Sequence, residues 1–119
     1  MRVLGGDNRT VTDERKWHEV ARTSDIGPGE MMYVEVGSDP VVLINFEGDF
    51  YALSDICTHQ EASLSDGEIV GDEIECPLHG GAFEIRTGLP ANFPVVVPVE
   101  TYEVKTEGEY VLVAKRLPT

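Results

Sequence analysis

Two cysteines and two histidines form a set of residues whose types and spacing indicate metal chemistry. Cys57 and His59 make a C-x-H pair, and after sixteen intervening residues Cys76 and His79 make a C-x-x-H pair. The chain contains only two cysteines and three histidines, so four of these five residues fall in two short segments. Thiolate and imidazole ligands together suit zinc or an iron–sulfur centre.

The order of the ligands along the chain helps to distinguish these metals. Structural zinc sites usually pair like ligands, with two cysteines close together and two histidines close together. Here each segment pairs unlike ligands, which fits a [2Fe–2S] cluster whose two cysteines bind one iron and whose two histidines bind the other. A zinc-stabilised interaction domain that uses the same four residues is the alternative from another class of protein.

The segments around these ligands, and a proline-bearing segment after them, resemble a known family. They are Cys57-Thr58-His59, Cys76-Pro77-Leu78-His79-Gly80-Gly81-Ala82-Phe83 and Thr87-Gly88-Leu89-Pro90-Ala91-Asn92-Phe93-Pro94. The resemblance is to the Rieske proteins, and specifically to the bacterial Rieske-type ferredoxins of aromatic ring-hydroxylating dioxygenase systems. It extends from about Trp17 to Ala114, and residues 57–67 and 75–90 are most similar to ferredoxins of carbazole-type dioxygenase systems.

The resemblance implies a cofactor and a role for each ligand. The chain is expected to bind one Rieske-type [2Fe–2S] cluster, with Cys57 and Cys76 on one iron and His59 and His79 on the other. In the family, the two histidines lie at the exposed tip, where electrons enter and leave, and the proline-bearing segment covers the cluster from a third side.

Departures from the high-potential members of the family predict a low reduction potential. The respiratory Rieske proteins have an extra cysteine in each ligand loop, where this chain has Ala62 and Leu78, so no disulfide is expected. They also direct a serine and a tyrosine hydroxyl at the cluster, where this chain has Gly81 and Phe83. Because hydrogen bonds to the sulfur atoms stabilise the reduced state, their loss places the expected potential near the low end of the Rieske range, about −150 mV.

The function implied by the resemblance is one-electron transfer, not catalysis. Rieske oxygenases also need a mononuclear iron held by two further histidines and a carboxylate, and His18 is the only histidine left over. The expected partners are an NAD(P)H-dependent ferredoxin reductase and a terminal oxygenase, bound transiently by a chain that is monomeric in isolation. A small Rieske subunit of an assimilatory nitrite reductase is the alternative within the same chemistry.

The elements that must position the ligands are short β-strands. No segment maintains an apolar period of 3.6 residues over three turns, and turn signals recur at the spacing expected of a sandwich or barrel. The sequence therefore predicts an all-β Rieske fold, an antiparallel sandwich or barrel base with a small inserted cluster-binding subdomain. The expected strands cover 16–21, 31–36, 41–46, 50–53, 68–70, 73–75, 82–85, 95–97, 99–105 and 110–114.

These elements predict a single Rieske domain over residues 14–117. Its base would comprise residues 14–54 and 86–117, and its cluster-binding subdomain residues 55–85, because the two ligand segments interrupt the strand pattern there. Residues 1–13 are polar and contain glycine, and they are expected to form a flexible extension.

The charge of the chain is strongly negative and uneven. Nine basic and 22 acidic residues give a net charge of −13, which argues against nucleic acid as a partner. From Thr23 to Glu84 there are fourteen acidic residues and no lysine or arginine, and six of the acids lie between Gln60 and Glu75. We expect this surface to steer a basic partner toward the histidines and to help keep the potential low.

Targeting signals are lacking in the printed sequence. It has no run of eighteen apolar residues and no apolar stretch typical of a signal peptide near Met1, so a cytoplasmic protein without membrane contact is expected.

Overall fold

In the computed structural model, which describes residues 16–58, 61–78 and 80–117, the chain forms two antiparallel sheets and confirms the all-β expectation. The expected extension, residues 1–13, lies outside the described residues. The strands are β2 (His18–Arg22), β3 (Met31–Val36), β4 (Asp39–Phe46), β5 (Asp49–Ser54), β6 (Glu68–Val70), β7 (Glu73–Glu75), β8 (Ala82–Glu84), β9 (Pro90–Asn92), β10 (Thr101–Glu107) and β11 (Tyr110–Lys115). Two 3-10 turns, η1 (Thr23–Asp25) and η2 (Leu64–Asp66), accompany them.

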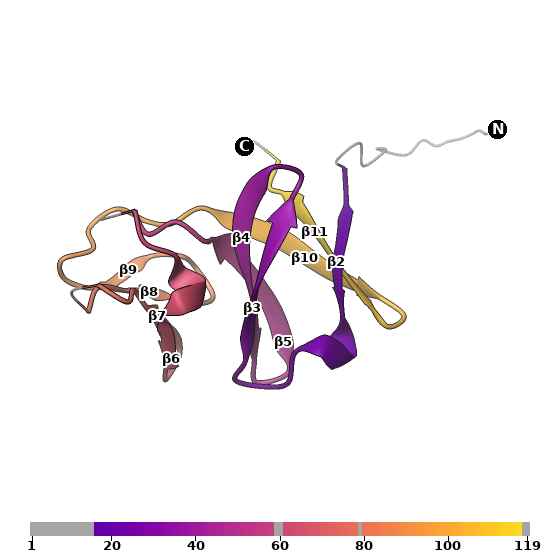
Figure 1. The fold of residues 1–119 in the computed structure, drawn as a ribbon, viewed down its shortest axis with the longest axis horizontal. Helices are drawn as coiled ribbons and strands as arrows, with labels where there is room; N and C mark the ends of the chain where they lie inside the picture. Colours follow the sequence, from indigo (N-terminus) through magenta and orange to yellow (C-terminus); the bar gives the residue numbers. More distant parts are fainter. Residues whose placement is uncertain (1–15, 59–60, 79, 118–119) are drawn as a thin grey trace.

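Six strands form the base of the molecule, in the order β2-β11-β10-β5-β4-β3 (Figure 1). Tight turns at Gly37, Gly48 and Gly108 connect consecutive strands, and all three glycines have positive φ. The sheet curls until its two edge strands, β2 and β3, come into contact. This curled sheet is the antiparallel base expected from the strand pattern.

Strand β4 connects the two halves of the hydrophobic core. Its central residues form a continuous apolar run, which is typical of a strand buried on both faces. Val41 and Leu43 pack into the core of the base, whereas Val42 and Ile44 pack into a second core shared with the small sheet. All four are fully buried, so β4 fixes the small sheet against the base.

The small sheet has the strand order β6-β7-β8-β9 and is inserted between β5 and β10 (Figure 1, left). It extends beyond the boundary expected at residue 85, because β9 pairs with β8. Sequence reasoning missed β9, since Pro90-Ala91-Asn92 has low β-propensity and its pairing depends on the neighbouring strand.

Residues 95–97, which were expected to form a strand, instead belong to a loop without strand pairing. The three valines favour β-structure by type, but Pro94 and Pro98 flank them. Proline has no backbone N–H to donate to a ladder, so it rarely continues a sheet. Val95 is buried while Val96 and Val97 are exposed, and this is not the alternation of a half-buried strand.

Candidate metal centre

Cys57 and Cys76 are brought together in the core between the base and the small sheet. Cys57 follows β5 and Cys76 directly follows β7, and both are buried with free thiols. They share one apolar cluster with the fully buried side chains of Leu64, Ile74 and Phe83. The structure therefore places two thiols, from segments far apart in the sequence, in one water-excluded environment.

The electrostatic environment of Cys76 shows that the two thiols interact. Burial raises the pKa of the Cys76 thiol, a hydrogen bond from the Leu78 backbone lowers it, and the adjacent Cys57 thiol raises it again. Without a cation, the raised pKa favours the protonated Cys76 thiol. A bound metal ion would displace the protons, because metals bind the thiolate.

His59 and His79 lie outside the described residues, so the structure does not place the expected imidazole ligands. Among the residues that it does describe, no group of three or more His, Cys, Asp and Glu side chains could hold a metal ion. The described neighbours of the two histidines are informative, however. Cys57 and Cys76 are buried, but Thr58 directly after the first, and Pro77 and Leu78 after the second, are exposed, so both chain segments turn outward there.

Backbone hydrogen bonds close each ligand loop on itself. The Cys57 amide donates to the carbonyl of Ala62 (3.0 Å), and the Cys76 amide donates to the carbonyl of Gly81 (2.7 Å). Gly80 adopts a φ of +71°, a conformation that glycine tolerates at little cost. Each cysteine is thus bonded through its amide to the far end of its own ligand loop.

Asp55 anchors the first ligand loop, although an acidic rim open to solvent is the simpler expectation for it. Its side chain is 1% exposed, and its Oδ1 accepts a hydrogen bond from the backbone N–H of Ser65 (2.8 Å). Its carbonyl also accepts a hydrogen bond from the Leu64 amide (2.7 Å). Asp55 therefore fixes η2 against the end of β5, whereas Glu61 and Asp66 are exposed.

Residues 93–97 follow β9 and form a third loop that is attached to both ligand loops. Thr58 donates its hydroxyl hydrogen bond to the Val97 carbonyl (2.7 Å), and Asn92, at the end of β9, donates its side-chain amide to the Gly80 carbonyl (3.0 Å). Val95 packs on Gly81. The three loops therefore form one connected unit.

Gly81 and Phe83 offer no hydroxyl to the centre, and Val95 packs closely on Gly81. A Cβ at Gly81 would lie 2.4 Å from Cγ2 of Val95, so any side chain there would require the Val95 side chain to shift. Phe83 is fully buried in the core. The absence of hydroxyl donors at these two positions favours a low potential.

Apolar side chains surround the place where the three loops meet. Ile56, Leu78, Phe93, Val96 and Val97 are all exposed, and Phe93 has 80% of its surface accessible. Pro90, by contrast, is half-buried in β9 opposite Phe83.

Glutamates occupy the outer face of the small sheet. Glu68 on β6 lies opposite Glu75 on β7, and Glu73 on β7 lies opposite Glu84 on β8. Like charges directly opposite each other destabilise a sheet. No lysine or arginine between Thr23 and Ile85 is available to offset them. The acidic character expected from the sequence is therefore concentrated beside the candidate centre.

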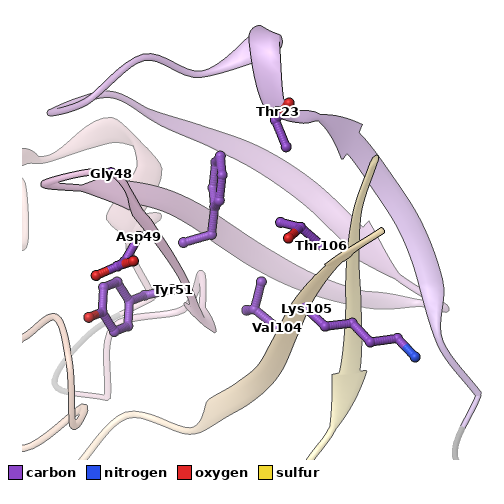
Figure 2. Close-up of a pocket in the computed structure, with 8 residues that line it drawn as sticks. Thr23, Gly48, Asp49, Tyr51, Val104, Lys105 and Thr106 are labelled. Atoms are coloured by element: carbon purple, nitrogen blue, oxygen red, sulfur yellow. The ribbon is translucent and has the colours of Figure 1, made fainter. Parts of the chain in front are cut away.

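A large cavity lies in the base, away from these loops (Figure 2). It has a volume of about 550 Å³ and opens where β5 and β10 separate beyond their paired residues Ala52 and Tyr102. Its lining includes no cysteine or histidine, so it is unrelated to the metal chemistry. The lining residues are Thr23, Gly48, Asp49, Phe50, Tyr51, Val104, Lys105 and Thr106.

Within the described ranges, no helix is long and apolar enough to cross a membrane.

Comparisons with known proteins agree with this geometry. Residues 16–103 match the family described as Rieske [2Fe-2S] domain. The ferredoxin CarAc of Metapseudomonas resinovorans is 47% identical over 95 residues, which are 78% of this chain and 89% of that protein. The ferredoxin component of the naphthalene 1,2-dioxygenase system of Pseudomonas putida is 42% identical over 98 residues, which are 82% of this chain and 94% of that protein.

A solved structure shows the same fold in a complex. It is described as the complex of reduced oxygenase and oxidized ferredoxin in carbazole 1,9a-dioxygenase. Its matching chain has a TM-score of 0.80 and 45% sequence identity, and the match covers 86% of this chain and 97% of that chain.

Proposed function

The chain belongs to the Rieske [2Fe-2S] domain family, and we propose that Cys57 and Cys76 bind one iron of its cluster while His59 and His79 bind the other. The observation that carries this assignment is the pair of buried, free thiols of Cys57 and Cys76, which meet from two loops in one apolar core. A soft, thiolate-binding metal centre suits such a donor pair. The outward turn of the chain at Thr58 and Leu78 supports exposed histidine ligands.

The protein is an electron carrier with one Rieske-type [2Fe–2S] cluster, and it is not itself a catalyst. When bound, the cluster supplies one-electron redox chemistry. The chain's own residues determine how that chemistry is used. The apolar core around Cys57 and Cys76 excludes water, and the Leu78 backbone offers a hydrogen bond to the Cys76 sulfur.

A reductase that oxidises NAD(P)H and a terminal aromatic ring-hydroxylating oxygenase are the partners we assign. Relatives of this chain are ferredoxin components of dioxygenase systems, and one is found in a complex with an oxygenase. These names favour the carrier over the nitrite reductase subunit. A carrier must leave one partner to reach the next, so we assign transient binding. We also assign a monomeric chain, which the acidic face of the small sheet steers toward its partners.

A cytoplasmic location completes the assignment. Cys57 and Cys76 are free thiols in the structure, and metal-binding thiols without a disulfide are typical of proteins in a reducing compartment.

Reconstitution tests the proposed function directly. The purified protein should be red-brown and contain two irons and two sulfides per chain. With NAD(P)H, a ferredoxin reductase and a terminal oxygenase, it should support product formation that stops when it is omitted. A colourless protein with one zinc per chain would support the zinc-binding alternative. A red-brown protein that co-purifies permanently with a nitrite reductase would support the alternative of a small Rieske subunit of that enzyme.

A further inference from the structure

The third loop exposes more apolar surface than its role in covering the centre requires. Phe93 is 80% exposed, Val96 is 70% exposed and Val97 is 54% exposed, although Val95 between them is buried. Single exposed apolar residues are common, but a contiguous group within one short loop marks an interaction site. An exposed phenylalanine contributes nothing to the core of its own chain.

The loop that presents this group is held in place. Val97 accepts a hydrogen bond from Thr58, and Val95 packs against Gly81, so the loop is attached to a ligand loop both at its middle and at its end. Asn92 adds the bond to the Gly80 carbonyl just before the loop begins. A partner that binds Phe93 would therefore meet a preorganised surface and would lose little conformational entropy on binding.

Charge and apolar surface lie at opposite edges of the small sheet. The third loop continues from β9 at one edge, whereas Glu68 is on β6 at the other edge and Glu73 and Glu75 are on β7 beside it. In protein complexes, charges at the rim mainly set the association rate and its salt dependence, whereas buried aromatic side chains mainly set the lifetime of the complex. In one interface, the glutamates can therefore set the association rate while the apolar loop sets the lifetime of the complex.

We infer that Phe93, flanked by Val96 and Val97, is the apolar anchor with which this chain docks on the terminal oxygenase. The matching surface of the oxygenase would be an apolar hollow with basic residues displaced to one side, opposite β6 and β7. Docking there would bring the partner against the two ligand loops, because the third loop is bonded to both. The inference rests on the proposed function and adds the residue that holds the complex together.

The test uses the holoprotein and the oxygenase to which the wild-type chain delivers electrons. Phe93→Ala should raise the Kd for that oxygenase roughly tenfold or more, equivalent to about 1.4 kcal/mol per tenfold. The change should appear in the dissociation rate, with the salt dependence of association unchanged. Phe93→Leu should retain most of the affinity, because leucine can fill part of the same hollow.

Leu117→Ala is the matched control, since Leu117 is another exposed apolar residue but lies in the base beside His18. It should bind like the wild type, and the reduction potential should be the same in all variants. A Kd for Phe93→Ala within twofold of the wild-type value, or an equal loss in Leu117→Ala, would overturn the inference. If the wild-type chain delivers electrons to no oxygenase, it is the proposed function that fails.

Discussion

At the candidate centre, the buried cysteines Cys57 and Cys76 are followed within one or two residues by exposed positions. Each thiol is buried, and the residue after Cys57 and the second residue after Cys76 are already exposed. Such an arrangement keeps the two thiols away from water while the chain beside them, at Thr58 and Leu78, is exposed. The spacing of the ligands was enough to predict this pair from the sequence, because few other arrangements use one thiol and one imidazole in each of two loops.

The role of Asp55 could not be predicted in the same way. An aspartate in an acidic, loop-like segment is most simply read as a solvated surface residue. Its burial depends on η2 folding back over the end of β5, which is a tertiary contact with no separate sequence signal. A weak hint is the aspartate at the start of a turn, where its side chain commonly accepts a backbone hydrogen bond.

Substitution of Asp55 tests this anchoring role. Asp55→Ala leaves the Ser65 N–H without its partner and should lower the free energy of unfolding by about 1.5–3 kcal/mol, the usual range for a hydrogen bond to a charged group. Iron loss to a chelator should be faster as well. Asp55→Asn keeps an acceptor oxygen and should lose clearly less stability. Equal losses in the two variants, measured by denaturant unfolding, would contradict an acceptor role.

The reduction potential is a second residue-scale prediction, because it depends on which hydroxyl groups are missing. Gly81 and Phe83 supply none, and Val95 fills the space beside Gly81. We therefore expect a midpoint near the low end of the Rieske range, about −150 mV. Protein-film voltammetry measures it directly. A clearly positive midpoint would show that other donors or charges dominate the potential.

At the level of elements, most strands of the two sheets could be predicted, whereas residues 95–97 of the third loop could not. The run 31–36 coincides with β3, and 68–70 and 73–75 coincide with β6 and β7, because glycine turns and β-branched residues delimit them clearly. The valine run 95–97 was wrongly expected to be a strand. There, two flanking prolines and the packing of Val95 on Gly81 outweigh the β-propensity of valine.

The attachment of the third loop can be tested by removing its two side-chain bonds. Thr58→Val and Asn92→Ala should each lower the free energy of unfolding by about 1 kcal/mol, the typical contribution of one hydrogen bond. Amide hydrogen exchange should accelerate in residues 93–97 more than in the base. Thr106→Val, on an exposed position of β10, serves as the control. Unchanged exchange in the third loop would indicate that packing alone holds it.

At the scale of the whole molecule, the basic residues are distributed unevenly. The small sheet carries two glutamate pairs and no lysine or arginine within its strands, whereas Lys105, Lys115 and Arg116 lie on the base. The sequence revealed this separation because the basic residues are absent from one continuous stretch. It could not reveal that the acids face one another across β6, β7 and β8, since that depends on strand register.

Neutralising the acidic face should affect association and stability in opposite directions. The triple variant Glu68→Gln, Glu73→Gln and Glu75→Gln should slow electron transfer to the oxygenase at low salt and reduce its salt dependence. It should also stabilise the fold, by roughly 0.2–1 kcal/mol for each like-charge pair removed.

Three neutralisations on the base provide the control for that variant, at Glu19, Asp49 and Glu109. They change the net charge equally but leave the small sheet intact. Stopped-flow rates at several salt concentrations separate the two cases. Equal slowing in both triple variants would mean that net charge, and not the sheet face, steers the partner.

The central claim is that two cysteines and two histidines of this chain hold one [2Fe–2S] cluster. Pulsed EPR of the reduced protein, produced with ¹⁵N-labelled histidine, measures the ligands of the reducible iron directly. We predict magnetic coupling to two histidine nitrogens, with one coupling lost or the cluster absent in each of His59→Cys and His79→Cys. A reduced cluster without histidine coupling, or an unchanged spectrum in both variants, would contradict the assignment.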